Sequence, residues 1–473
     1  MSESSERLGA DTPFGLDEVL AATCGELARL GDRVHFTGVT TDTRALRPGE
    51  LFVAIRGATW DGHQYLDEAA RRGAGAVLAE REAVDQPLAC GVVVVRESLA
   101  ALGDLAAFHR RRRRARVLAV AGSNGKTTTK EMAAAILRQA FGADAVLHTR
   151  GTQNNLVGLP LTLLRLEESQ RVAVVELGMN GPGEVWRLAE IAQPDAGVIT
   201  CVAPEHLEGV GSLHGAAEAE AELFRRLRPS ATAVVNADDP LVVAAATDFP
   251  GPVVRFGTDG DVRAEDVADG GLDGSQFTLR VGADATRVRL PVPGRHNVSN
   301  ALAATALVTL AGVSLDDVRV ALEAFEPPSM RMQVERLPNG ITVINDAYNA
   351  NPASMAAALH TLAASAASRR LAVLGEMREL GAETEAAHEE LGRVVAACAL
   401  DLLVVLGPHA TLVRDAAVAA GMPAAHIVLA HDHADAGAGL RAFCRSGDLL
   451  LLKGSRGASL ESVLTHLGSE DRA

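Results

Sequence analysis

Aromatic residues are scarce in this chain, at 3% of 473 residues, so its cores must consist mostly of Ala, Leu and Val. Long apolar runs are also missing: those present, such as 449–452, fall far short of the roughly 20 residues that span a bilayer. The N-terminus is polar and acidic, which predicts no signal peptide. The net charge of −15 argues against a nucleic-acid partner. We therefore expect a cytoplasmic protein that contacts neither membranes nor nucleic acid.

Cysteines are few and scattered. The five cysteines form no Cys-x-x-Cys pair, which is typical of reduced thiols in a cytoplasm and gives no sign of a metal cluster. Basic residues gather in a single run of five arginines, Arg110 to Arg114. We expect this run to be a solvated helix end or a linker, with a phosphate-facing role as the alternative.

The chain does have a repeated alternation of short apolar runs and helical segments. Its length suggests about three domains. We place boundaries after the arginine run and at the Glu-Pro-Pro break that begins at 326, which gives units 1–114, 115–325 and 326–473. The predicted fold class is α/β, with a doubly wound, mostly parallel sheet in the central unit. Strands are expected at 51–55, 75–78, 91–95, 117–120, 172–175, 197–201, 233–236, 342–345, 370–374, 402–406 and 448–452, and helices at 64–72, 129–140, 183–192 and 216–227.

The most informative segment is a small-residue turn, Gly-Ser-Asn-Gly-Lys-Thr at 122–127, between an apolar strand and a helix. A strand, a glycine turn with Lys-Thr and then a helix are the parts of a phosphate-binding loop. Glycines let backbone N–H groups converge on anionic oxygens, and the helix N-terminus adds a favourable dipole. Lys126 would reach the β- and γ-phosphates, and the Thr127 hydroxyl would bind Mg²⁺. The alternative is a turn that carries a surface lysine.

In open α/β sheets, ligands bind beyond the carboxyl ends of the strands, so residues that follow strands are the next candidates. Glu176 ends a central strand and could hold Mg²⁺, or it could simply face solvent. His206 follows the next strand, although Mg²⁺ prefers oxygen ligands. Asn300 lies in a helix start and could belong to a capping cluster. Asp346 follows a strand of the third unit and could accept hydrogen bonds from ribose hydroxyls, or merely end the strand.

Taken together, these segments resemble the Mur ligase family, whose members are ATP-dependent amide-forming enzymes of peptidoglycan precursor synthesis. The resemblance covers essentially the whole chain. The matching segments are 41–44, 48–54, 61–63, 122–130, 154–155, 176–180, 206–209, 294–300, 346–352, 374–380 and 453–456. The resemblance implies an N-terminal UDP-substrate-binding domain, a central ATP-binding domain and a C-terminal Rossmann-like ligase domain.

The resemblance also implies roles for individual residues. The UDP-binding segment corresponds to Thr41, Asp42, Thr43 and Arg44. The ATP phosphate loop corresponds to Gly122, Ser123, Asn124, Gly125, Lys126, Thr127 and Thr128, and the adenosine and phosphate part of ATP is expected at Asn300, Arg331 and Asp346. Two magnesium ions are expected at Thr127, Glu176 and His206, and catalysis is expected to depend on Lys126, Glu176 and His206. The incoming substrate is expected near Asn349 and Asn351.

Within the family, the segment 346–352 resembles the ligase that joins D-alanyl-D-alanine to UDP-N-acetylmuramoyl-tripeptide. This resemblance implies ATP and Mg²⁺ as cofactors and those two molecules as substrates. The tripeptide carboxylate would attack the γ-phosphate to give an acyl phosphate, which the dipeptide amine would then attack. Lys126 and magnesium would neutralise the approaching anions, so no nucleophilic side chain is needed. We expect the protein to be a monomer.

The chain departs from the family at a few positions: Met330 stands where the family usually has Gly and Thr152 where Asn is commoner, and the departure that matters most lies in the central unit. Many Mur ligases carry a carbamylated lysine in the helix after the His206 loop, but no lysine occurs here between Lys130 and Lys453. Glu220 stands at the lysine position, and we expect its carboxylate to support the second magnesium ion. The alternative is a solvated acidic helix face. Glu220 lies about 200° around the helix from Glu218, so these two side chains should point in different directions.

Other functions are also compatible with parts of the sequence. The sister ligase that adds the third amino acid to the UDP-muramoyl dipeptide shares the domain plan, but its Asp-Asn-Pro-Arg-type segment is missing. A folate polyglutamate ligase would not need the UDP-type first domain. A P-loop kinase or NTPase, or a non-catalytic nucleotide-binding scaffold, would leave the first and third domains unexplained.

Overall fold

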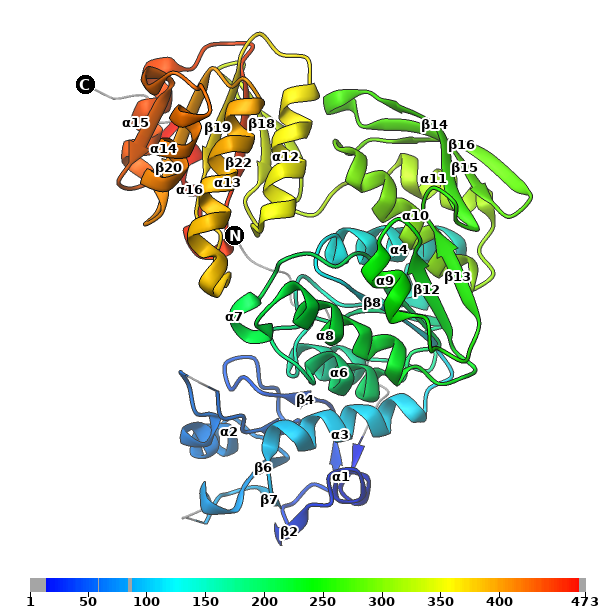
Figure 1. Ribbon diagram of the computed structural model, residues 1–473. Coiled ribbons are helices and arrows are strands. Elements are labelled where there is room, and N and C mark those ends of the chain that lie inside the picture. Colours follow the sequence, from blue (N-terminus) through cyan, green and yellow to red (C-terminus); the bar gives the residue numbers. More distant parts are fainter. Residues whose placement is uncertain (1–13, 58, 84–86, 468–473) are drawn as a thin grey trace.

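The computed structural model describes residues 14–57, 59–83 and 87–467, and its main sheets follow one another along the chain (Figure 1). The first main sheet has five strands in the order β2-β7-β6-β5-β4. Strands β4 to β7 run parallel, and β2 pairs antiparallel with β7. The strands are β2 (Glu26–Arg29), β4 (Val39–Thr40), β5 (Leu51–Val53), β6 (Ala76–Glu80) and β7 (Gly91–Val95), and a small ribbon pairs β1 (Phe14–Gly15) with β3 (His35–Phe36).

Three helices accompany this first sheet: α1 (Leu16–Thr23), α2 (Leu66–Arg71) and α3 (Ser98–Arg111). The helix expected at 64–72 is present as α2, which follows a 3₁₀ turn at Gly62–Tyr65. Helix α3 packs against both the first unit and the helices of the central unit. It therefore links the first two units.

The central sheet has nine strands in the order β16-β15-β14-β13-β12-β11-β8-β10-β9. The strands are β8 (Arg116–Ala121), β9 (Val146–His148), β10 (Val172–Glu176), β11 (Ala196–Ile199), β12 (Thr232–Asn236), β13 (Val253–Phe256), β14 (Val262–Asp269), β15 (Ser275–Val281) and β16 (Asp284–Leu290). All pairs from β9 to β14 are parallel, which confirms the prediction of a mostly parallel sheet. The antiparallel extension through β15 and β16 was not predicted.

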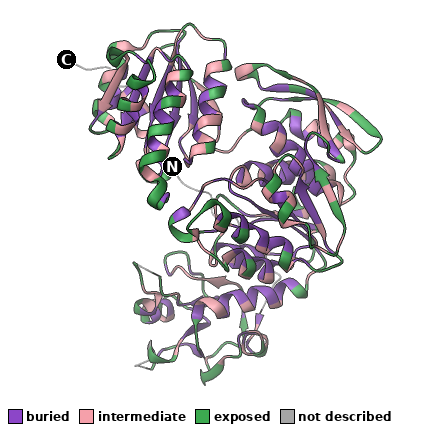
Figure 2. Cartoon of the chain, viewed as in Figure 1, coloured by how far each residue is buried: buried purple, intermediate pink, exposed green. Residues whose placement is uncertain are grey.

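Helices cover both faces of the central sheet. Strand β8 shows this, because its successive buried side chains belong to two different apolar clusters. Leu118 and Val120 belong to the apolar cluster of α4 and α10, whereas Val117 and Ala119 belong to the cluster of α3, α6 and α8. Buried residues accordingly line both sides of the strands (Figure 2). The helices are α4 (Lys126–Phe141), α5 (Gly158–Leu163), α6 (Glu184–Ala192), α7 (Leu207–Val210), α8 (Leu213–Arg226), α9 (Pro240–Ala245), α10 (Arg295–Thr309) and α11 (Leu315–Glu323).

The third main sheet has six strands in the order β17-β18-β22-β19-β20-β21, parallel except for the edge strand β17. Its strands are β17 (Gln333–Arg336), β18 (Thr342–Asp346), β19 (Arg370–Leu374), β20 (Leu402–Leu406), β21 (Ile427–Ala430) and β22 (Leu449–Lys453), and its helices are α12 (Pro352–Ala364), α13 (Thr384–Ala397), α14 (Ala410–Ala419), α15 (His433–Phe443) and α16 (Ser462–Leu467). The predicted boundaries after 114 and 325 fall between sheets and stay predictions. Among the described residues, none of the helices is long and apolar enough to cross a membrane.

The arginine run differs from its prediction at one residue. It does form a helix end, because α3 ends within it and Arg111 and Arg112 are exposed. Arg110, however, is buried and donates to the Ala192 carbonyl at 3.1 Å and to Asp195 at 2.9 Å. The expectation of a solvated run is wrong for Arg110, because its side chain points into the junction between α3 and the central unit.

Candidate functional site

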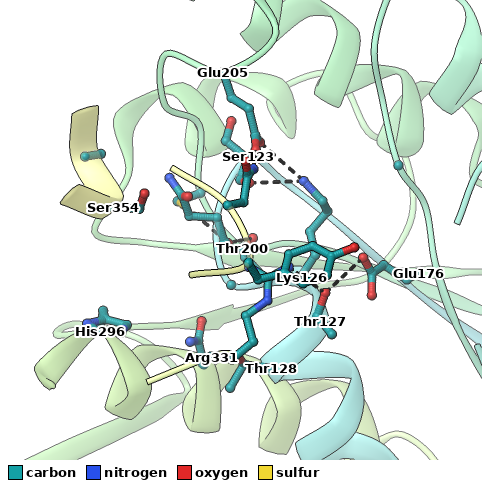
Figure 3. Close-up of a pocket in the computed structure, with 18 of the residues that line it drawn as sticks. Ser123, Lys126, Thr127, Thr128, Glu176, Thr200, Glu205, His296, Arg331 and Ser354 are labelled. Carbon is teal, nitrogen blue, oxygen red and sulfur yellow. Dashed lines mark hydrogen bonds and ion pairs between the residues drawn. The ribbon is translucent and has the colours of Figure 1, made fainter. Parts of the chain in front are cut away.

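A cavity of about 510 Å³ lies between the central and C-terminal units, where the predicted strand ends meet. Its walls come from the phosphate-loop segment, the ends of β10 and β11, the start of α10 and the residues that follow β18 (Figure 3). Its position at the carboxyl ends of parallel strands is the expected place for a ligand. The cavity contains most of the residues that the sequence indicated, including Lys126, Glu176, His206, Asn300, Arg331 and Asp346.

The phosphate-loop segment has the predicted strand–turn–helix form, with α4 beginning at Lys126 rather than at 129. Gly122 and Gly125 have φ of +114° and +83°, a region that favours glycine. A Cβ on Gly125 would lie 2.2 Å from Oδ1 of Asn300, so the close approach of α10 also requires glycine there. The hydroxyl of Thr200 donates to the Asn124 carbonyl at 2.6 Å and fixes the turn.

Lys126 is held over this loop by oxygen atoms. Its Nζ donates to the carbonyls of Gly122 at 2.5 Å and Ser123 at 3.0 Å, and it lies 3.4 Å from Oε2 of Glu205. Burial acts to lower the pKa of Lys126, but the carboxylates of Glu205, Glu220 and Glu176 outweigh burial and raise it. Lys126 therefore carries its positive charge into the cavity.

Thr127 and Glu176 lie side by side in the cavity, as predicted (Figure 3). The Thr127 hydroxyl donates to Oε1 of Glu176 at 3.2 Å, and Asn154 Nδ2 donates to the same oxygen at 2.8 Å. The other carboxylate oxygen, Oε2, is buried and has no hydrogen-bond partner. A hydroxyl beside a buried, unsatisfied carboxylate oxygen is the kind of donor set that a hard divalent cation prefers. Thr127 and Glu176 therefore fit a magnesium ion.

Sequence reasoning missed Lys130, which supports this pair. Its fully buried ammonium group donates to the carbonyls of Thr149 at 2.8 Å and Gly151 at 3.0 Å, and it lies 3.8 Å from Oε2 of Glu176. The available signal was its spacing, since Lys130 follows Lys126 by four positions and shares its helix face.

His206 also lines the cavity, and its partners are two acidic side chains. It pairs through Nδ1 with Glu379 of the C-terminal unit, and its Nε2 lies 3.9 Å from Oε1 of Glu205. Within residues 14–57, 59–83 and 87–467, no group of three or more His, Cys, Asp or Glu side chains is arranged to hold a metal. The prediction of two magnesium ions at Thr127, Glu176, His206 and Glu220 stays a prediction.

Glu220 points inward, as its position on the helix predicted, but toward the loop backbone. It is 1% exposed and accepts a hydrogen bond from Gly122 N at 2.8 Å. Burial raises the pKa of Glu220 to about 7, against the opposing effect of Lys126. Glu218 on the same helix is exposed and pairs with Arg225. Glu220 is not among the residues that line the cavity, so its role as a magnesium partner stays a prediction.

The remaining predicted nucleotide-binding residues, Asn300, Arg331 and Asp346, also line the cavity. Asp346 pairs with Lys453 at 2.5 Å. The Arg331 guanidinium lies 4.2 Å from the centre of the Tyr348 ring and donates to the Thr127 hydroxyl at 3.4 Å. Stacking on one face of the guanidinium leaves its edge free for anions, so Arg331 adds a second positive charge beside the loop.

The two residues predicted near the incoming substrate connect the central and C-terminal units. Asn349 Nδ2 donates to Oε1 of Glu205 at 2.9 Å. Asn351 caps α12 through its side chain and donates to Oδ1 of Asn124 at 2.9 Å. Both side chains therefore hold the C-terminal unit over the phosphate loop. Sequence reasoning did not single out Glu205, although it directly precedes His206.

The segment Thr41 to Arg44 does not line the cavity. It follows β4 in the first unit, where Thr43 is buried and Arg44 is exposed. Arg44 pairs with Asp42 through two side-chain nitrogens, Nε at 2.9 Å and Nη2 at 2.8 Å. The segment thus lies outside the cavity, and its role in UDP binding stays a prediction.

Comparison with known proteins gives consistent similarities along the chain. Family models match successive segments: "Mur ligase family, catalytic domain" at 35–120, "Mur ligase middle domain" at 120–308 and "Mur ligase, glutamate ligase domain" at 330–456. The UDP-N-acetylmuramoyl-tripeptide–D-alanyl-D-alanine ligase of Bacillus subtilis is 35% identical over 433 residues, covering 91% of this chain and 93% of that protein.

Solved structures agree with these matches. A crystal structure of MurF from Acinetobacter baumannii superposes with a TM-score of 0.89 at 30% identity, covering 97% of this chain and 99% of that one. The MurF ligase of Thermotoga maritima in complex with ADP superposes with a TM-score of 0.80 at 28% identity, covering 91% and 96%.

Proposed function

The chain belongs to the Mur ligase family, and we propose that it joins D-alanyl-D-alanine to UDP-N-acetylmuramoyl-tripeptide at the expense of ATP. The product would be the UDP-linked pentapeptide of peptidoglycan synthesis, formed through an acyl phosphate. The observation that carries this proposal is the cavity between two domains, in which Lys126 of the phosphate loop and residues of the C-terminal domain line the same space. A ligase needs such a place, because one substrate must be activated and a second must reach it.

We assign the phosphates of ATP to the loop. Backbone N–H groups of the glycine turn and the N-terminus of α4 would bind phosphate oxygens. Lys126 and Arg331 would neutralise the charge that builds up when the tripeptide carboxylate approaches the γ-phosphate. Asn300 and Asp346 would contact the rest of the nucleotide. Lys453, which pairs with Asp346, would hold that carboxylate in place.

We assign magnesium to Thr127 and Glu176, because Glu176 presents an unsatisfied buried oxygen beside the Thr127 hydroxyl. The ion would supply charge neutralisation at the phosphates. A second ion would depend on His206 and Glu220. The test of the latter is Glu220→Ala with a magnesium titration. An unchanged magnesium dependence would remove Glu220 from the metal site.

The substrates would enter from different sides. We assign the UDP end of the tripeptide substrate to Thr41 to Arg44, where Arg44 can leave Asp42 for a diphosphate oxygen at little cost, because an exposed ion pair contributes little stability. We assign the dipeptide to the region of Asn349 and Asn351. The cavity lies between these two regions and the phosphate loop, where the new bond would form.

The experiment that tests the proposal measures phosphate release from ATP with candidate acceptors. Release should require both UDP-N-acetylmuramoyl-tripeptide and D-Ala-D-Ala, and the ligated product should appear in equal amount. Release with the UDP-dipeptide and a single amino acid would indicate the sister ligase instead. Release without any acceptor, or transfer of phosphate to one acceptor with no amide product, would indicate an NTPase or a kinase.

A further inference from the structure

The cavity contains one acidic side chain that the proposed function does not yet use. Glu205 is 8% exposed at its side chain and lies between the two domains. Its Oε2 lies 3.4 Å from Nζ of Lys126, and its Oε1 accepts a hydrogen bond from Asn349 Nδ2 at 2.9 Å. A carboxylate in this place is unexpected, because the neighbouring loop is built to receive phosphates.

When ATP is bound, Lys126 must turn its charge toward the phosphates, and Glu205 then loses its cation. A buried carboxylate without a counter-charge is destabilised, and a neighbouring phosphate adds repulsion. The two other strongly basic side chains of the cavity are already engaged, because Arg331 is assigned to the phosphates and Lys453 pairs with Asp346. The cation that replaces Lys126 should therefore arrive with a substrate.

We propose that Glu205 binds the α-ammonium group of the incoming dipeptide and so selects an amine as the second substrate. This inference rests on the proposed function. An ammonium group is compact and has three donors, so it fits between a carboxylate and the polar edge of the cavity. Glu205 is close to the lysine that marks the phosphoryl end of ATP, which places the amine beside the carbonyl that it must attack.

A different role for Glu205 gives different kinetics. If Glu205 only holds Lys126 in place before ATP arrives, its loss should change the interaction with ATP and the activation of the tripeptide. If it binds the ammonium group, its loss should weaken binding of D-Ala-D-Ala and leave activation intact. Hydroxylamine separates the two steps, because it is uncharged at neutral pH and can capture an activated carboxyl group without an ammonium site.

The test compares wild type with Glu205→Gln and Glu205→Asp. The matched control is Glu218→Gln, an exposed carboxylate of the same domain that pairs with Arg225. For Glu205→Gln we expect the KM for D-Ala-D-Ala to rise about 10- to 100-fold, the usual effect of a lost charged hydrogen bond. The KM for ATP and the rate of hydroxamate formation should stay within about twofold of wild type. Glu205→Asp should recover part of the affinity, and Glu218→Gln should match wild type.

An unchanged KM for D-Ala-D-Ala in a folded Glu205→Gln would overturn the inference, and so would an equal loss of hydroxamate formation. Thermal melts show whether each variant is folded. If Glu205→Gln does not fold, the same kinetic measurements on Glu205→Asp decide the question. Failure of the proposed function looks different, because wild type itself would then not ligate D-Ala-D-Ala.

Discussion

The central domain meets its two neighbours in different ways. At the N-terminal side, α3 joins both domains in one apolar cluster, and Arg110 crosses the junction to Asp195. At the C-terminal side the domains also share apolar contacts, but around the cavity they meet through single polar bonds, such as Asn349 to Glu205 and Asn351 to Asn124. The apolar junction at the N-terminal side, which we call the sealed junction, holds its two domains together. A polar junction around a cavity can instead open with a small loss of free energy.

This difference indicates which part of the molecule moves. Each hydrogen bond across the cavity contributes about 1 to 3 kcal/mol net, the larger values where a carboxylate accepts it, because water replaces the lost partner. Opening the apolar junction would instead expose a continuous core at roughly 25 cal/mol per Å². We therefore expect the C-terminal domain to swing away to admit ATP while α3 keeps the first two domains together.

The largest expected effect comes from the cavity. Lys126→Met should lower kcat/KM about 10²- to 10³-fold, since it removes the cation that meets the phosphates. The melting temperature should fall although the variant stays folded, because Met replaces the stem of Lys126 but the buried carboxylate of Glu205 loses its cation. Phosphate release and a thermal melt check both parts. Arg393→Met, an exposed position paired with Glu389 and Glu390, is the control. If Lys126→Met did not fold, the residues around the cavity would be required for folding and not only for activity, which would contradict this comparison of the two junctions.

The second prediction concerns pH at the sealed junction. Burial lowers the pKa of His109, which contacts the Leu166 carbonyl, to about 4 from an ordinary value near 6.5. Between pH 6.5 and pH 4, His109 is therefore protonated in the unfolded chain but neutral in the folded chain. The free energy of unfolding falls as the pH drops from about 6.5 to about 4. The loss attributable to His109 is about 3 kcal/mol. Urea unfolding at pH 7 and pH 4.5 should show a smaller loss in His109→Gln than in wild type. Equal losses would show that His109 does not contribute to this pH dependence.

The third prediction concerns the hydrogen bonds that Arg110 makes at the sealed junction. Arg110→Met should lower the free energy of unfolding by about 2 kcal/mol, because the carbonyl of Ala192 and the carboxylate of Asp195 lose a donor in a buried place. Arg111→Met is the matched control: this exposed neighbour should change stability by no more than about 0.5 kcal/mol. The kcat at saturating substrates should stay near wild type in both variants. A drop in kcat for Arg110→Met with unchanged stability would mean that this junction also takes part in the reaction.

The smallest predicted effect concerns Asn351, which both caps α12 and contacts Asn124. Asn351→Ala loses both the cap of α12 and the contact with Asn124, whereas Asn351→Ser keeps a capping oxygen and loses only the contact. Chemical denaturation should show Asn351→Ala about 1 kcal/mol less stable than Asn351→Ser. Both variants should raise the KM for ATP by the same small factor, since the domain contact is gone in each. Different KM values in the two variants would show that the cap, not the domain contact, matters for ATP.

Much of the fold and the site could be predicted from local patterns. The phosphate loop, the parallel strands and the strand-end residue Glu176 follow from apolar runs and a glycine turn, which depend on neighbours in sequence. The antiparallel extension was missed although β15 alternates buried Phe277 and Leu279 with more exposed residues, a period-two signal that was present. Lys130 was missed because a polar residue in a helix is usually solvated, and only packing against Thr149 and Gly151 shows otherwise.

The sequence by itself determined that the chain has a phosphate loop with Lys126 and Thr127, placed at the end of a parallel strand, and that Glu220 faces away from Glu218. It also carried the family resemblance that the comparisons confirm. Only the tertiary structure decided that Arg110 is buried, that Glu220 bonds to Gly122, and that Glu205 lies between Lys126 and Asn349. The physical reason is that these contacts join residues about 80 to 145 positions apart. Their distances depend on how helices and domains pack, which no local pattern of residues reports.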